Sequence, residues 1–129
     1  MKPKVIILLI LGFIFYPLLA QEPTEEIVKA FTNGKAELLQ PFLKDEVSLS
    51  VVNRKFRVNK KDAVDGVQDF FESIVIQSFK LRHSCIKEES GYMIGSLQAS
   101  NQRYRVNCFY TKINDKYFIN QIRIDKSNE

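Results

Sequence analysis

The chain has 129 residues, of which 45% are hydrophobic and 26% charged, and this composition favours one folded domain over a disordered chain. A single histidine and two cysteines argue against a metal centre rich in His and Cys ligands and against a disulfide-rich scaffold.

The first twenty residues have the order of a secretory signal. Lys2 and Lys4 precede an apolar run from Val5 to Phe15, and Ala20 offers a small residue for cleavage. The run is shorter than the about 20 residues that a membrane span needs. We therefore expect residues 1–20 to be a signal peptide, residues 21–129 to form one domain, and the product to be periplasmic or secreted, with no membrane attachment after cleavage. An uncleaved anchor is the alternative.

Loss of Lys2 and Lys4 would leave 17 basic and 15 acidic residues, a net charge of only +2. This balance gives little support for an acidic partner, and together with export it argues against nucleic acid.

Two short helical segments are predicted first. Thr24 is placed to cap a helix that Asn33-Gly34 ends, because glycine adopts the left-handed conformation after a helix without steric cost. Lys35 to Gln40 then predicts a helical turn that buries Leu38 and Leu39, before Pro41.

A hairpin and the main helix follow. From Glu46 the apolar period becomes two, with a turn at Asn53-Arg54 and a short return strand at the edge of a sheet. Asn59 is predicted to cap a helix whose apolar stripe packs on that sheet; the stripe comprises Ala63, Val64, Val67, Phe70, Phe71 and Ile74. Asp62, Asp65 and Asp69 fall off the stripe, which is typical of a solvated face.

Alternating residues from Ile76 to Asp125 predict four antiparallel strands. The breaks lie at Glu88 to Gly91, Ser100-Asn101 and Asn114-Asp115. In the last strand the alternation groups Phe118 with Ile122 and Ile124, and Tyr117 with Ile119. The fold class is therefore α+β, with N-terminal helices packed on a bent antiparallel sheet.

This order of elements resembles the cone-shaped fold of the nuclear transport factor 2-like superfamily. The stretch 33–39 resembles that superfamily's turn between its first two helices. The stretches 94–97, 104–106 and 118–124, with Phe70-Phe71, resemble a family of short exported bacterial proteins known as domain of unknown function 4783. The resemblance implies the fold and export, and it implies no catalytic residues. Members of the superfamily include enzymes and binding modules, so the fold does not choose between them.

Strand parity predicts which side chains line the interior of the cone. These candidates for binding a small apolar molecule are His83, Cys85, Met93, Tyr104, Cys108 and Tyr110. The alternative is that the aromatic side chains fill the cone. We expect no cofactor and no metal, because one histidine and two separated cysteines make a poor ligand set.

The two cysteines are predicted to be buried free thiols. One strand separates Cys85 from Cys108, so they would lie roughly 9–10 Å apart, beyond the about 7 Å between Cα atoms that a disulfide allows. A nucleophile formed by His83 and either cysteine is the sharpest enzymatic hypothesis, but no third group that would orient the histidine is identifiable.

Five basic residues are predicted on the sheet face opposite His83: Lys80, Arg82, Arg103, Arg105 and Arg123. Such a face can be solvated, can contact an anionic surface, or can form a homodimer through the sheet. The sequence thus favours a non-enzymatic binding domain for a small apolar ligand or a protein partner, with an enzyme using His83 as the alternative.

Overall fold

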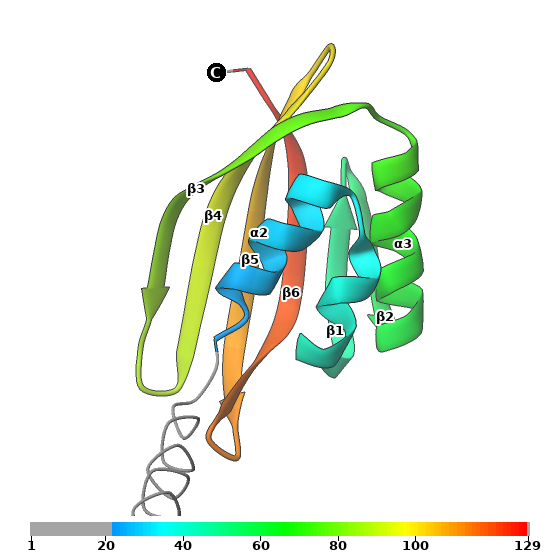
Figure 1. Cartoon of the computed structure of the whole chain (residues 1–129). Helices are drawn as coiled ribbons and strands as arrows, with labels where there is room; N and C mark the ends of the chain where they lie inside the picture. Colours follow the sequence, from blue (N-terminus) through cyan, green and yellow to red (C-terminus); the bar gives the residue numbers. More distant parts are fainter. Residues whose placement is uncertain (1–21, 129) are drawn as a thin grey trace, which may run out of the picture.

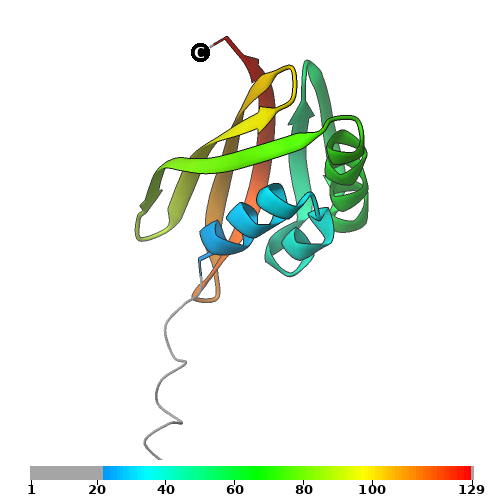
Figure 2. The same ribbon diagram turned by 45° about the horizontal axis from the view of Figure 1, so that its top comes forward.

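A six-stranded sheet curls around three helical segments that all lie on one of its faces (Figures 1 and 2). The computed structural model describes residues 22–128, so the predicted signal peptide lies outside the described residues. The helical segments are α2 (Thr24–Asn33), the 3₁₀ helix η2 (Ala36–Phe42) and α3 (Lys60–Glu72). Within residues 22–128 no helix is long and apolar enough to cross a membrane.

The strands are β1 (Leu43–Val51), β2 (Arg54–Asn59), β3 (Ile76–Ile86), β4 (Ser90–Ala99), β5 (Arg103–Ile113) and β6 (Lys116–Ser127), arranged in the order β2-β1-β6-β5-β4-β3. Neighbouring strands are antiparallel except β1 and β6, which are parallel. The predicted four-strand meander and the edge position of β2 are confirmed. The sheet as a whole is mixed, because β1 joins the meander through a pairing that the local alternation of residues does not reveal.

The ends of α2 illustrate one confirmed and one wrong prediction. Gly34 has φ +67° and ends the helix in the left-handed conformation, as expected. At the other end Pro23 occupies the N-cap, and Thr24 does not cap. Its hydroxyl instead lies 2.8 Å from that of Tyr110, a buried contact that ties the start of α2 to β5.

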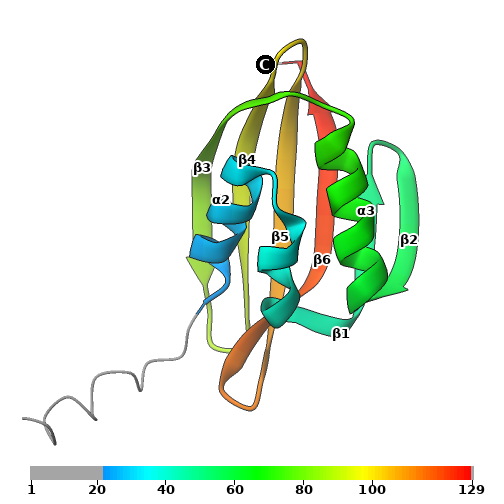
Figure 3. The ribbon, with the colours of Figure 1, turned by 45° about the vertical axis from the view of Figure 1, so that its right-hand side comes forward.

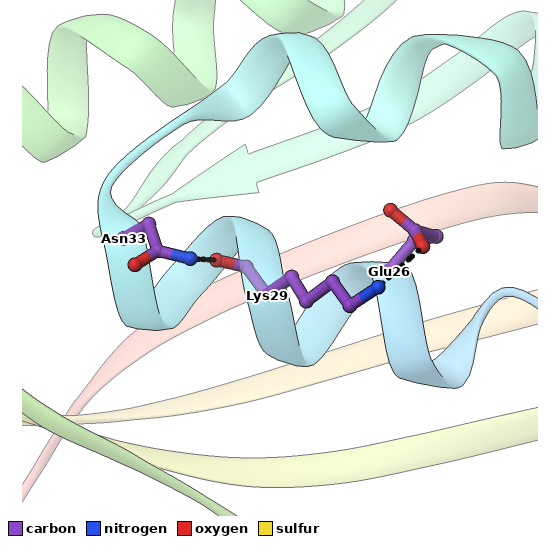
Figure 4. Close-up of polar contacts among 3 residues, drawn as sticks. All are labelled: Glu26, Lys29 and Asn33. Atoms are coloured by element: carbon purple, nitrogen blue, oxygen red, sulfur yellow. Dashed lines mark hydrogen bonds and ion pairs between the residues drawn. The ribbon is translucent and has the colours of Figure 1, made fainter.

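The solvent-facing side of α2 carries short-range polar contacts (Figure 4). Lys29 Nζ lies 3.3 Å from Glu26 Oε1, and Asn33 Nδ2 donates to the Lys29 carbonyl oxygen at 2.9 Å. The ion pair is exposed and therefore adds at most about 0.5 kcal/mol. The opposite side of α2 buries Ile27, Ala30 and Phe31.

Helix α3 begins as the sequence predicts. Asn59 Oδ1 accepts a hydrogen bond from the Asp62 backbone N–H at 2.8 Å, which satisfies one of the free amides of the first turn. Ala63, Val67, Phe70 and Phe71 are buried. Figure 3 shows α3 beside the hairpin that β1 and β2 form.

The inner face of the sheet is filled by aromatic side chains. The ring of Phe31 lies 5.0 Å from that of Phe71 and 5.2 Å from that of Phe79, measured between centroids. Met93, Cys108 and Tyr110 belong to the same buried cluster. The side chains in this part of the cone are therefore packed against one another, which is the filled arrangement that the sequence left open.

Two of the register shifts in the sheet are β-bulges that reverse the predicted faces of later side chains. The β3–β4 register shifts between Leu81 and His83, so Arg82 is an extra residue, and the β5–β6 register shifts at Asn120. Because side chains alternate with period two, one extra residue moves every following side chain to the other face.

The bulge at Asn120 corrects the predicted grouping in the last strand. Tyr117 and Ile119 are buried together with Ile122 and Ile124, whereas Phe118 is only half-buried. The alternation Phe118, Ile122, Ile124 is therefore wrong for the first half of β6.

Candidate functional site

A groove of about 660 Å³ lies between α3 and the β1–β2 hairpin. Its apolar lining comes from both strands, from the turn between them, from α3 and from β5, and comprises Leu49, Val51, Val52, Phe56, Val58, Phe70 and Tyr104. The ring of Phe70 contacts that of Tyr104 edge-on, with centroids 5.0 Å apart. The groove therefore meets the packed interior of the cone at these two rings.

Close packing of α3 on β1 shapes this groove. A Cβ atom added at Gly66 would lie 2.7 Å from Leu49 Cδ2, so the tip of the Leu49 side chain packs directly against the glycine. Phe56 pairs with Leu49 across the hairpin and remains 49% exposed. A large aromatic side chain is thus presented to solvent beside an apolar surface.

Charged side chains border the groove. Asp62, Asp65 and Asp69 come from α3, Arg54 is the first residue of β2, and Lys126 comes from β6. None of these five takes part in an ion pair with another described residue. The aspartates that the sequence assigned to a solvated face are indeed exposed, and they also line this groove. These aspartates are three and four residues apart, which places them on one side of the helix, and this spacing was the sequence signal that could have identified them as a group.

The six predicted pocket residues divide into three groups. Tyr104 lines the groove. Met93, Cys108 and Tyr110 are at most 1% exposed and belong to the core. His83 is exposed and Cys85 half-buried, because the bulge at Arg82 pairs them with Ile94 and Tyr92, which alternate with the core residues of β4. The expected interior position of His83 and Cys85 is therefore wrong.

The structure does not bring His83 and Cys108 together. His83 lies on the outer face of the sheet, where its ring is 5.4 Å from that of Tyr92, whereas Cys108 lies in the core. Burial raises the pKa of the Cys108 thiol far above its ordinary value, so the thiol stays protonated and is a poor nucleophile at neutral pH.

Both cysteines are free thiols, with Cys108 buried and Cys85 half-buried. Strand β4 separates them, as predicted, and the bulge also places them on opposite faces of the sheet. Within residues 22–128 no group of three or more His, Cys, Asp or Glu side chains is arranged to hold a metal ion.

The basic residues share the outer face, as predicted. Lys80, Arg82, Arg105 and Arg123 are exposed, and Arg103 is half-buried. They lie across β3, β5 and β6, and Ser96 of β4 lies between Lys80 and Arg105 in the register. His83 lies on this same face rather than on the opposite one.

Known proteins place the chain in a family. The family described as "Domain of unknown function (DUF4783)" matches residues 24–125. A DUF4783 protein structure from Bacteroides uniformis is 38% identical, covers 81% of this chain and 97% of its own, and has a TM-score of 0.77. One from Bacteroides ovatus is 36% identical, covers 81% and 94%, and has a TM-score of 0.76.

A more distant structure shows the wider fold. An NTF-2 like protein of unknown function from Silicibacter pomeroyi is 8% identical, covers 81% of this chain and 89% of its own, and has a TM-score of 0.57. Curated proteins provide no match. The chain therefore belongs to the DUF4783 family and has the nuclear transport factor 2-like fold that its sequence resembles.

Proposed function

We propose that this protein is an exported, non-enzymatic binding module that holds a small apolar or amphipathic molecule in the groove between α3 and the β1–β2 hairpin. The observation that carries the proposal is the apolar lining of a groove of about 660 Å³, a size typical of small-molecule sites. Charged side chains at the border would contact the polar end of an amphipathic ligand.

The position of the groove differs from the one expected from the sequence. Of the six expected pocket residues only Tyr104 lines it, and Phe56 is the exposed large hydrophobic side chain of its lining. The enzymatic alternative requires His83 in a pocket, whereas His83 is exposed on the outer face of the sheet. Binding through the groove therefore has the better support.

We expect Phe56→Ser to weaken binding of the neutral fluorescent probe N-phenyl-1-naphthylamine at least tenfold. A buried aromatic contact is worth about 1.5–3 kcal/mol, and about 1.4 kcal/mol corresponds to tenfold in affinity. Phe109→Ser is the matched control, since Phe109 is a strand phenylalanine that is 37% exposed but lies outside the groove. Fluorescence titration of the purified protein measures both; equal binding by wild type and Phe56→Ser would contradict the proposal.

A homodimer through the outer face of the sheet is a second candidate, and it rests on a separate observation. Phe109 is 37% exposed there and pairs with Tyr92 in the register between β4 and β5. Tyr92 in turn contacts the His83 ring. Three neighbouring rings on an exposed sheet face supply the kind of apolar centre that protein interfaces use.

For this dimer, Phe109→Ser is the test variant and Phe56→Ser is the control. We expect sedimentation velocity to show a concentration-dependent dimer for wild type and Phe56→Ser, and at least a tenfold weaker dimer for Phe109→Ser. A wild-type protein that remains monomeric at every concentration measured would remove this candidate and leave the groove unaffected.

A further inference from the structure

A second hollow, of about 480 Å³, lies on the outer face of the sheet and is distinct from the groove. Three arginines from two strands line it: Arg82 of β3, and Arg103 and Arg105 of β5. Strand β4 runs between them and contributes Ser96. Cationic side chains thus border the hollow on both sides of one strand.

The register of the sheet explains this convergence. Ser96 pairs directly with Arg105, and the small serine lies between the larger outward side chains of Ile94 and Gln98 along β4. Arg82 is the extra residue of the β3 bulge, and a bulge redirects the side chain that it carries. Arg82 is thus the residue of the bulge that moved His83 out of the core, and it lines the hollow.

The electrostatics of the hollow favour an anion. Among residues 22–128, no acidic residue lines it. Asp125 pairs with Arg105 in the register, but its carboxylate oxygen lies 3.5 Å from Arg123 Nη2. Neither Arg82 nor Arg105 forms an ion pair with any other described residue.

Hydrogen bonds hold the Arg103 side chain in place beside the hollow. Arg103 Nε donates to Gln98 Oε1 at 3.0 Å, and Gln98 Nε2 donates to the Ala99 carbonyl oxygen at 2.7 Å. Arg103 therefore contributes a fixed positive charge beside the two exposed guanidinium groups, which lowers the ordering cost of binding an anion.

We propose that this hollow is a binding site for a tetrahedral oxyanion of the phosphate or sulfate class. Arg82 and Arg105 approach the anion from the two sides of β4, and each guanidinium can donate two parallel hydrogen bonds to its oxygens. The Ser96 hydroxyl lies between them and donates a further hydrogen bond. This site is independent of the groove and of its ligand.

The test uses inorganic phosphate as the probe, with sodium chloride added to hold the ionic strength constant. Thermal unfolding of the purified protein should show a midpoint that rises with the logarithm of the phosphate concentration c once this exceeds the dissociation constant, because a ligand of the folded state stabilises it by RT ln(1 + c/Kd). In Arg82→Gln/Arg105→Gln the dissociation constant for phosphate should rise at least tenfold. Both side chains are exposed, so we expect the variant to fold.

The matched control is Lys44→Gln/Lys55→Gln, which also removes two positive charges, but from exposed positions outside the hollow. It should retain the wild-type response. Arg82→Lys/Arg105→Lys keeps the charges without the bidentate geometry and should fall between wild type and the Gln variant. A midpoint that does not rise with phosphate, or a rise that is equal in Arg82→Gln/Arg105→Gln and in the Lys44→Gln/Lys55→Gln control, would overturn the proposal.

Sedimentation with phosphatidylglycerol vesicles identifies the source of the oxyanion. We expect phosphate to bind in solution and the vesicles not to recruit the protein, which assigns the site to a soluble anion. Recruitment that Arg82→Gln/Arg105→Gln abolishes would assign it instead to a lipid headgroup. Recruitment that this variant leaves unchanged, together with a phosphate response that it also leaves unchanged, would contradict the site.

Discussion

Replacing Gly95 with alanine is expected to destabilise the protein by about 2–3 kcal/mol, the upper part of the range for overpacked cores. A Cβ atom at this position would lie 2.2 Å from Cζ of Phe79 and 2.8 Å from its Cε1. The Phe79 ring cannot retreat freely, because it is 9% exposed and packs on the Phe31 ring. Urea unfolding followed by circular dichroism measures the loss.

A double-mutant cycle identifies the clash as the cause. Phe79→Leu removes the ring atoms that the new methyl group would meet, so Gly95→Ala/Phe79→Leu should lose less than the sum of the single variants. Gly66→Ala is the control. Its Cβ would meet only the flexible tip of Leu49 at 2.7 Å, and alanine gains about 1 kcal/mol of helix propensity over glycine. Strict additivity of Gly95→Ala and Phe79→Leu would contradict this account.

Removing the Tyr110 hydroxyl should cost about 1–3 kcal/mol of the free energy of unfolding. The Tyr110 and Thr24 hydroxyls are 2.8 Å apart, and the two residues are 1% and 4% exposed. Tyr110→Phe therefore leaves the Thr24 hydroxyl buried without this partner. Thr24→Val should cost a similar amount, because it leaves the Tyr110 hydroxyl unpaired instead.

The double variant Thr24→Val/Tyr110→Phe should be more stable than the sum of the single losses predicts, since neither polar atom remains to be satisfied. Urea unfolding of all four proteins gives the coupling energy. Tyr104→Phe serves as a control, because the described contacts of Tyr104 include a ring contact with Phe70 but no hydrogen bond of its hydroxyl. A coupling energy of zero would show that the hydroxyl pair does not stabilise the start of α2.

The burial of the Tyr110 hydroxyl predicts that the free energy of unfolding depends on pH. Burial raises the pKa of Tyr110 above its ordinary value of 10.0. A folded-state pKa above the unfolded value gives stability that is fully present below pH about 10 and is lost as pH rises further, at up to about 1.4 kcal/mol per pH unit. Tyr110→Phe should therefore lose stability less steeply than wild type above pH about 10. Measuring the free energy of unfolding against pH for both proteins tests this; equal slopes above pH about 10 would contradict the burial of the Tyr110 hydroxyl.

Local signals in the sequence determined the start of α3, the end of α2 and the strands of the meander. Asn59 caps α3 through a contact three residues away, and Gly34 ends α2 through its own backbone conformation, so neither depends on distant parts of the chain. The turn at Asn114-Asp115 likewise shows in its two residues, which have φ +50° and +67°. These features follow from short-range sterics and hydrogen bonds.

Tertiary structure decided which side chains meet. The bulges at Arg82 and Asn120 reversed the expected faces of His83, Cys85 and Phe118, because a bulge depends on how two paired strands bend together and leaves no mark in the period-two pattern. The groove depends on long-range pairing, because its residues come from segments as distant as Leu49 and Lys126, which only the parallel pairing of β1 with β6 brings side by side. The arginine hollow depends on the pairing of β3, β4 and β5, which places Arg82 and Arg105 on the two sides of Ser96.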